Sequence, residues 1–486
     1  MFALSGLPTI ILVIEILVRL GLSIRVIMRR LPTGVTASWL ILILFIPFVG
    51  AGLYLFIGES RIGRHRARRE REIYPAYVAY LTRMRQRTKD IPQSLSHVDS
   101  RLSREIEAAT GHPTMGGNSI ALLKDANEFF DMLIGTIERA TRSIVMEFYI
   151  WDPQGRVNDV AAALICAKER GIDCRVLIDA VGSRPFLHSR QIRTLRKAGV
   201  GVVVALPAGF GRAPLFSRID HRNHRKLVVI DDCLAFFGSM NMADPAYFKV
   251  KAGVGKWVDL MSVVRGPVVE ALSLEFVQDW ELETSQGQKE NRDFLEHNTL
   301  EAVGQQSFQV LPSGPTASLG CIHAAVLSAL YAAEKTLTIT TPYFVPDHSV
   351  ITALVSAARR GVKVELILPE LCDSKLTRLA GYAFYDELLA SGVQIAHFQG
   401  GLLHTKTIVV DEEIALFGTV NLDQRSFWLN YELTLIGYNN DFAREVLGRQ
   451  QEYLHNSVLV DRCAWEDRSF GKRLASNISQ FFSPLL

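Results

Sequence analysis

The pattern of apolar and polar positions divides the chain into an apolar N-terminal part and two long stretches that alternate short β-branched runs with helical runs. Residues 7–27 read as an apolar helix interrupted by Glu15, Arg19 and Arg25, and residues 36–57 carry no charge. A helix needs about 20 apolar residues to cross a bilayer, so the second segment is long enough. We therefore predict a membrane-anchoring helical hairpin at residues 1–60, in which the first helix either spans the bilayer or lies at its surface.

Arginines follow the hairpin closely, whereas the link between its two segments offers only Arg29 and Arg30. The positive-inside rule places the larger cluster, and the chain after it, in the cytoplasm. Two readings of the cluster remain open: it holds the folded part against anionic headgroups, or it is a solvated topology signal. Its members are Arg61, Arg64, Arg66, Arg68, Arg69 and Arg71.

An internal repeat organises the rest of the chain. The segment His224–Asn241 matches His404–Asn421 at an offset of 180 residues (404 − 224), and residues 171–179 match residues 361–369 further upstream. Alternating strand-like and helix-like runs in each half indicate βαβ units and a sheet covered by helices. We predict an α/β fold of two duplicated βαβ sandwich domains with pseudo-twofold symmetry. The expected ranges are a connector at 61–116, a first domain at 117–283, a linker at 284–304 and a second domain at 305–486.

The repeated segment carries the candidate chemistry. His224 and Lys226 stand two apart at the start of a strand-like run, so both side chains point to one face, and His404 and Lys406 repeat the arrangement. Two imidazoles and two ammonium groups suit a phosphodiester. One neutral histidine attacks phosphorus, the other protonates the leaving alcohol, and the lysines neutralise the phosphoryl oxygens. This chemistry needs no metal and no cofactor.

Asp231 and Asp411 complete the two motifs, but each follows its lysine by an odd number of residues. On a regular strand they therefore face away from the pocket, and we assign them a structural role. The histidines then need carboxylates from elsewhere to orient them, for which Asp259 and Glu432 are the candidates. Small polar residues after the strands are expected to bind phosphoryl oxygens: Ser239, Asn241, Thr419 and Asn421. We interpret His221 as a polar loop residue.

Before its motif, the first half contains an insertion at residues 204–220. The repeat offset falls across this stretch from 193 residues (388 − 195) to 180, so 13 residues are additional. A loop here borders the predicted site, where it would form a lid, dip into lipid, or be a tolerated surface insertion.

Composition narrows the class of protein further. The chain has 53 lysines and arginines against 50 aspartates and glutamates, a net charge of +3, which argues against a dedicated nucleic-acid binder. Six cysteines without CxxC or zinc-like spacing favour reduced thiols in the cytosol over a disulfide scaffold.

Longer strings narrow the assignment to a family. RNHRKLVVIDD, TPYFVPD, LLHTKTIVVD and GTVNLDQRSFWLNYE, behind two apolar segments, resemble bacterial cardiolipin synthases of the phospholipase D superfamily. A small departure is that Thr419 replaces the serine found in the first copy. The resemblance implies a phosphatidyltransferase of the bacterial inner membrane, multi-pass, with its catalytic domains on the cytoplasmic face. Its expected partners are phosphatidylglycerol and anionic membrane lipids; the oligomeric state stays open.

The resemblance also implies a reaction. Two phosphatidylglycerol molecules become cardiolipin and glycerol through a phosphohistidine, with His224 as nucleophile and His404 as acid and then base. Three alternatives differ in acceptor, substrate or activity: a phospholipase D that uses water, a nucleic-acid phosphodiesterase, and a non-catalytic membrane scaffold. The last does not explain two intact motifs. The second would need a basic groove interleaved with aromatic residues, which the sequence does not display.

Overall fold

The computed structural model describes residues 6–29, 33–46, 48–58, 64–88, 97–207, 220–284, 301–315 and 319–483. The chain divides into two compact units, which are treated separately below. The first comprises Met1–Ala67 with Ala208–His221, and the second comprises Arg68–Pro207 with Arg222–Leu486.

Helices make up most of the described part of the N-terminal unit: α1 (Gly6–Met28), α2 (Thr33–Phe45), α3 (Val49–Leu53) and the π-helical turn η1 (Tyr54–Gly58). Val26, Ile43 and Tyr54 form a small core, where the Tyr54 ring meets Trp39 edge to face. Glu15 and Arg19 form an ion pair one helical turn apart on α1. Much of the remaining apolar surface of α1 is exposed.

The expected membrane hairpin is not supported, because no described helix is both long and apolar enough to cross a bilayer. Residues 36–57 do not form one helix: α2 ends at Phe45 and a new helix begins at Val49. The sequence gives a physical reason in Pro47, since proline has no amide hydrogen to donate and disfavours helical geometry in the residue before it. Phe48, which caps α3, has a φ of 57°. The apolar composition of residues 36–57 does not by itself reveal this break between α2 and α3.

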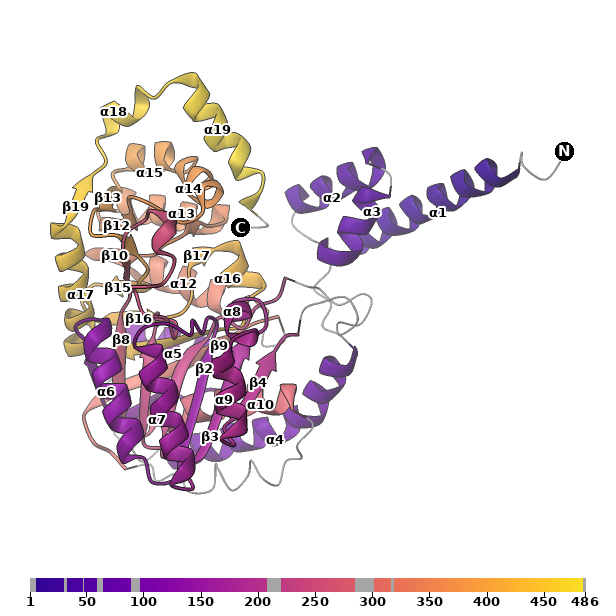
Figure 1. Ribbon diagram of the computed structural model, residues 1–486. Coiled ribbons are helices and arrows are strands. Elements are labelled where there is room, and N and C mark those ends of the chain that lie inside the picture. Colours follow the sequence, from indigo (N-terminus) through magenta and orange to yellow (C-terminus); the bar gives the residue numbers. More distant parts are fainter. Residues whose placement is uncertain are drawn as a thin grey trace. The chain divides into compact units, whose positions relative to one another are not determined.

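In the larger unit, both repeated halves build one 15-stranded sheet (Figure 1). Its order is β19-β13-β12-β10-β15-β16-β18-β9-β1-β8-β6-β5-β2-β3-β4. The first half supplies β1 (Met115–Leu122), β2 (Ser143–Phe148), β3 (Asp173–Asp179), β4 (Gly201–Ala205), β5 (Lys226–Ile230), β6 (Leu234–Gly238) and β8 (Met261–Arg265). The second supplies β9 (Gln306–Ser313), β10 (Thr336–Thr340), β12 (Lys363–Pro369), β13 (Gln394–Phe398), β15 (Thr407–Val410), β16 (Ile414–Gly418), β18 (Glu432–Tyr438) and β19 (Ser457–Leu459).

The pseudo-twofold of the repeat lies at the antiparallel junction of β1 with β9. Going outward from that junction, each half has the same succession of strands, with β8, β6, β5 and β2 matching β18, β16, β15 and β10. In each half two parallel pairings follow the inner antiparallel ones, and the second half adds an antiparallel edge strand, β19, beside β13. The two halves thus share a single mixed sheet.

Helices cover both faces of the sheet, as alternating side chains require. Val145 on β2 points into a central core, whereas its neighbours Ile144 and Met146 point into an outer one. The outer core of the first half packs under α6 (Ala126–Arg139), α7 (Val157–Glu169) and α9 (Arg190–Lys197), which lie side by side in Figure 1. The outer core of the second half packs under α12 (Cys321–Ala332), α13 (His348–Arg359) and α15 (Tyr385–Ser391). Two equivalent helices, α10 (Val268–Glu283) and α17 (Asn440–His455), contribute to the central core.

The stretch expected as a connector contains α4 (Arg64–Thr88) and α5 (His97–Thr110). Tyr80, Leu81 and Met84 on α4 join the central core. Arg69 donates hydrogen bonds to the carbonyl oxygens of Leu282, at 3.1 Å, and Thr284, where α10 ends and carbonyl groups lack helical partners. This arginine, expected among those facing lipid headgroups, is therefore engaged within the protein.

Short elements complete the fold: α8 (Arg184–Leu187), η2 (Val250–Ala252), β7 (Trp257–Val258), β11 (Phe344–Val345), α14 (Lys375–Tyr382), β14 (Leu402–Leu403), β17 (Leu422–Asp423), α16 (Gln424–Trp428), α18 (Arg462–Glu466) and α19 (Phe470–Gln480). Most of the insertion expected at 204–220, and of the linker expected at 284–304, lies outside the described residues. His221 belongs to the N-terminal unit.

Candidate active site

Each motif histidine lies just before a strand of its own half and is hydrogen-bonded to the backbone of the other half. The amide of His224 donates to the carbonyl of Tyr431 at 2.9 Å, and the amide of His404 donates to that of Val258 at 2.7 Å. The segment before His404 also forms a short parallel pairing, β14 with β7. Backbone pairing between the halves therefore brings the two motifs to one place.

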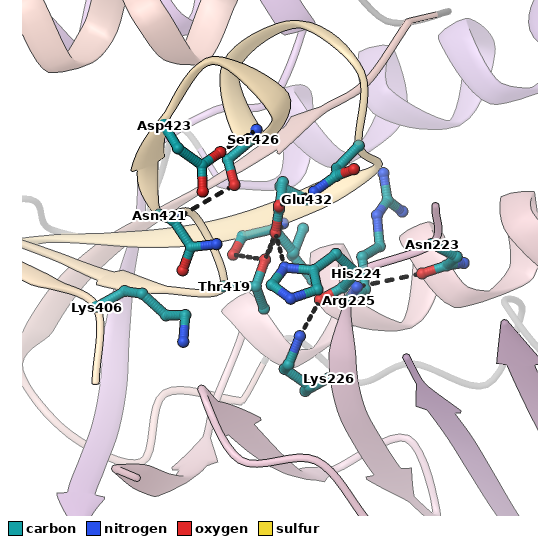
Figure 2. A network of polar contacts seen from close by, with 12 residues as sticks. Asn223, His224, Arg225, Lys226, Lys406, Thr419, Asn421, Asp423, Ser426 and Glu432 are labelled. Carbon is teal, nitrogen blue, oxygen red and sulfur yellow. Dashed lines mark hydrogen bonds and ion pairs between the residues drawn. The ribbon is translucent and has the colours of Figure 1, made fainter. Parts of the chain in front are cut away.

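The carboxylate partners of the histidines are exchanged between the halves. Nδ1 of His224 lies 2.8 Å from Oε2 of Glu432, and Nδ1 of His404 lies 2.6 Å from Oδ1 of Asp259 (Figure 2 shows the first pair). In the sequence, Asp259 follows His224 in the first half and Glu432 follows His404 in the second half. In the structure each histidine receives the carboxylate of the opposite half, so neither half alone holds a complete pair.

Ser239 and Thr419, expected at the phosphate, contact these carboxylates instead. The Ser239 hydroxyl donates to Asp259 at 2.7 Å and accepts the amide of Leu260 at 3.0 Å. The Thr419 hydroxyl donates to Glu432 at 2.5 Å and accepts the amide of Leu433 at 2.9 Å. Because each hydroxyl has one hydrogen and gives it to a carboxylate, the structure makes both residues supports of the orienting carboxylates.

The two asparagines expected at the phosphate are buried beside the motifs. The Asn241 side-chain oxygen accepts the amide of Ile150 at 3.2 Å, which fixes the loop after β2. Asn421 follows β16 near Lys406 and Thr419 (Figure 2). Its side-chain oxygen is buried without a hydrogen-bond partner among the described residues, as expected of a group that faces a site for a ligand.

The lysines lie under the histidines and are deeply buried. Nζ of Lys226 donates to the carbonyl of His224, and Nζ of Lys406 donates to that of His404, both at 2.5 Å. Burial lowers the pKa of Lys226 to about 7 and that of Lys406 to about 8, although Glu432 and Asp259 act in the opposite direction. Folding has already removed most of the water from each lysine side chain. Binding of an anion therefore costs little further dehydration of these groups, and the anion favours their charged form.

The same burial determines the protonation states of the two histidines and their two carboxylate partners. Desolvation lowers the pKa of both His224 and His404 to about 4, against the effect of their carboxylates. Burial raises the pKa of Glu432, but His224 and Lys226 outweigh it and the net shift is downward; Asp259 behaves likewise beside His404. At neutral pH both imidazoles are therefore neutral. A carboxylate only accepts, so each ring keeps its hydrogen on Nδ1 and leaves a lone pair on Nε2.

Aromatic rings that sequence reasoning did not assign border both histidines. The ring of Tyr149, directly after β2, lies 5.0 Å from that of His224, and Lys226 Nζ lies 5.6 Å from the Tyr149 ring centre. Trp257 and Tyr343 lie 4.5 Å and 6.4 Å from the His404 ring. No spacing rule links these residues to the motifs; only their position after β2 or β10, or before Asp259, could have drawn attention to them.

Asp231 and Asp411 turn away from this site, in agreement with strand parity. The Asp231 carboxylate accepts the amides of Thr141, Arg142 and Ser143 at 2.7 to 2.9 Å. Asp411 makes the equivalent contacts with the three residues at 334–336, at 2.7 to 2.8 Å. Burial alone would raise the pKa of Asp231, but these amides lower it. Both carboxylates thus hold the turns that start β2 and β10.

The chain is similar to known proteins over most of its length. Residues 133–280 and 326–452 match the family model described as "Cardiolipin synthase, PLD-like domain", and residues 9–59 match the model "Phospholipase_D-nuclease N-terminal". The chain is 41% identical to proteins named cardiolipin synthase A from Salmonella arizonae and Salmonella paratyphi B, with 96% of each chain covered.

Among solved structures, a phosphatidylserine synthase from Haemophilus influenzae aligns with a TM-score of 0.57 at 14% identity, covering 79% of this chain and 98% of that one. At that identity the similarity establishes the fold alone. The family models and the extensive identity to curated relatives carry the assignment further: the chain belongs to the bacterial cardiolipin synthases of the phospholipase D superfamily.

Proposed function

We propose that this chain is a phosphatidyltransferase that joins two phosphatidylglycerol molecules into cardiolipin and releases glycerol. The observation that carries the proposal is the pair of imidazoles at one site, each held by a carboxylate of the opposite half. Such a pair provides both a nucleophile and an acid–base group for exchange at a phosphodiester. The family of the chain and the names of its relatives supply the substrate class.

In the proposed first step, Nε2 of His224 attacks the phosphorus of one phosphatidylglycerol. A phosphorus–nitrogen bond forms and the bond from phosphorus to the headgroup glycerol oxygen breaks. His404 donates a proton to that oxygen, so glycerol leaves as a neutral alcohol. Because burial keeps free His404 neutral, its proton must be acquired together with the anionic substrate, whose charge offsets the desolvation. Asp259 stabilises the imidazolium until this proton is transferred.

In the proposed second step, the neutral His404 removes the proton from a headgroup hydroxyl of a second phosphatidylglycerol. That oxygen attacks the phosphohistidine, the phosphorus–nitrogen bond breaks, and His224 is restored. Lys226 and Lys406 neutralise the phosphoryl oxygens in both steps. One phosphodiester is exchanged for another, so the reaction consumes no nucleotide donor.

The acceptor distinguishes the proposed transferase from a phospholipase D that hydrolyses its substrate. His224 and His404 have only 7% and 2% of their surface exposed, which restricts the access of bulk water to the intermediate. A second lipid held in the same bilayer has a high effective concentration at the site, which favours the alcohol over water.

We further propose that the enzyme acts at the cytoplasmic face of the bacterial inner membrane. Helix α1 exposes apolar side chains over most of its length, including Ile14 and Leu17 at 55% and 62% exposure. A surface of that kind indicates contact with lipid or with another apolar partner. Embedding of the N-terminal unit, and its multi-pass topology, are part of this proposal.

The test uses purified full-length protein in detergent with phosphatidylglycerol as the sole lipid, followed by quantification of glycerol and lipid products. We expect cardiolipin and glycerol in equal amounts. Phosphatidic acid without cardiolipin would contradict the proposal and favour hydrolysis.

A further inference from the structure

The C-terminal helix α19 has its large apolar side chains on the outside. Phe470 and Phe481 have 80% and 83% of their surface exposed, and Leu474, Ile478 and Phe482 have between 45% and 50%. Successive spacings of four residues place Phe470, Leu474 and Ile478 on one face of the helix. Water-soluble helices generally turn such a stripe inward, so its exposure here requires an explanation.

Small polar residues occupy the buried face of α19. Ser476 and Ser479 are 2% and 6% exposed, where the helix packs against α14. Their hydroxyls donate to the carbonyls of Lys472 and Ala475, one turn earlier, at 3.0 Å and 2.8 Å. Because the helix satisfies these hydroxyls itself, serine can line this contact at little cost. The outward position of the apolar stripe thus results from a well-formed packing of the opposite face.

Helix α14 connects this stripe to the candidate active site. Asp373, two residues before α14 begins at Lys375, accepts the Tyr343 hydroxyl at 2.8 Å, and the Tyr343 ring lies 6.4 Å from that of His404. Leu371 and Leu376, on either side of Asp373, are 44% and 40% exposed. Exposed apolar side chains thus lie on α19 and at the start of α14, the helix on which α19 packs and which follows the loop near His404.

The first half adds to the same rim. Lys249 Nζ binds the Asp373 carboxylate at 2.9 Å, which fastens the segment around η2 to the loop before α14. On that segment Tyr247 and Val250 are 56% and 61% exposed. Exposed apolar residues of both halves thus lie close in sequence to the ion pair of Lys249 with Asp373.

We propose that α19, with this neighbouring rim, is a surface that docks on a bilayer containing anionic phospholipid. Lys472 and Arg473 are the charged residues of α19, both basic and exposed, which suits anionic headgroups better than an acidic or neutral partner. The position of the stripe also fits a lipid substrate, which must pass from the bilayer to His404. In this last respect the inference rests on the proposed function, whereas the docking itself does not.

Photo-crosslinking tests the occupant directly. p-Benzoylphenylalanine replaces Phe470 or Phe481 in the full-length protein, and vesicles of phosphatidylglycerol and phosphatidylcholine carry a clickable acyl chain. Tyr331 on α12, 48% exposed, is the control position. We expect lipid adducts at positions 470 and 481 and few at position 331. Adducts to a second copy of the chain, or equal lipid labelling at Tyr331, would overturn the proposal.

Kinetics test whether the docking serves substrate entry. The variant Phe470→Ser/Leu474→Ser/Ile478→Ser is compared with Met132→Ser, a control at an exposed position of α6. We expect the triple variant to lose roughly tenfold or more of its activity on vesicles, because burial of three large apolar groups is lost, but to retain its rate on monomeric short-chain phosphatidylglycerol. Loss on both substrates with an unchanged thermal transition would contradict the proposal.

Failure of the proposed function gives a different result from failure of the docking. If the unmodified protein makes no cardiolipin from either form of phosphatidylglycerol, the proposed reaction is wrong, while the crosslinks still report on the surface. If it makes cardiolipin but α19 captures no lipid, the docking proposal alone is wrong. Lys472→Gln/Arg473→Gln adds a check on charge: it should reduce crosslinking to vesicles with phosphatidylglycerol more than to phosphatidylcholine alone.

Discussion

Nδ1 of His404, in the second half of the repeat, lies 2.6 Å from Oδ1 of Asp259 in the first half. The pair is fastened on both sides, since the His404 amide is bonded to the carbonyl of Val258, the residue before Asp259. Ser239 fixes the same carboxylate oxygen. The orientation of this imidazole thus depends on the correct registration of the two halves, and a small shift between them would separate the pair.

Replacement of Asp259 by asparagine tests this dependence. The amide cannot stabilise an imidazolium, and its NH₂ group favours the wrong tautomer of His404. We expect the turnover number on phosphatidylglycerol to fall by roughly 10²- to 10⁴-fold with little change in KM. Asp231→Asn is the matched control, because that carboxylate holds a turn away from the site. Asp231→Asn should lower the free energy of unfolding, while its turnover number falls much less than that of Asp259→Asn. Equal losses of turnover in the two variants would contradict the assigned role.

The order of the two histidines is tested by trapping the intermediate. His404→Ala removes the acid of the first step as well as the base of the second. His224 can still attack phosphorus, with glycerol taking its proton from water, so a phosphatidyl adduct should form slowly and accumulate when phosphatidylglycerol is added. His224→Ala should give no adduct. Mass spectrometry of peptides around residue 224, under conditions that preserve phosphoramidates, measures the result. An adduct on His404 in the His224→Ala variant would reverse the roles.

The sequence indicates which residues belong to the candidate site better than it indicates which of them contact one another. Identical spacing in two copies identifies His224 and His404, and strand parity turns Asp231 away from them. The exchanged pairing was not accessible, because it depends on the register of β14 with β7 and on contacts between segments over a hundred residues apart. Ser239 was assigned to the phosphate because position after a strand cannot show which acceptor its hydroxyl meets.

For the fold, too, the sequence predicts the elements better than the contacts between them. The repeat predicts two similar halves, but not that β1 and β9 join them into one sheet, since neither strand lies in the repeated motif. At the N-terminus, composition predicts a continuous helix over 36–57, and the helix ends at Phe45 near Pro47. A single residue with no amide hydrogen outweighs the apolar average over the segment.

The lysines predict an unusual dependence of stability on pH. Burial lowers the pKa of Lys226 to about 7 in the folded chain, below its value in the unfolded chain. Between pH 7 and the unfolded value near 10.4, the unfolded state binds more protons, so the free energy of unfolding rises with pH. In Lys226→Met this contribution disappears, and the slope between pH 8 and 9.5 should decrease by about 1.4 kcal/mol per pH unit. Urea unfolding at several pH values measures it, and an unchanged slope would show that the ammonium group is not buried as described.

Replacement of Arg225, which lies between His224 and Lys226, is expected to reduce the stability of the folded chain. Its side chain is buried on the opposite side of the strand, where Nη1 lies 2.9 Å from Glu275 and 3.0 Å from Asp279. Arg225→Leu would leave these carboxylates buried without their cation, at a cost of about 3–5 kcal/mol in the free energy of unfolding. The second half offers a control in Thr405, the corresponding residue, whose buried hydroxyl has no hydrogen-bond partner among the described residues. Thr405→Val should be neutral or slightly stabilising. Denaturant unfolding of both variants measures the difference, and comparable stability would mean that the ion pairs do not hold the strand that carries His224.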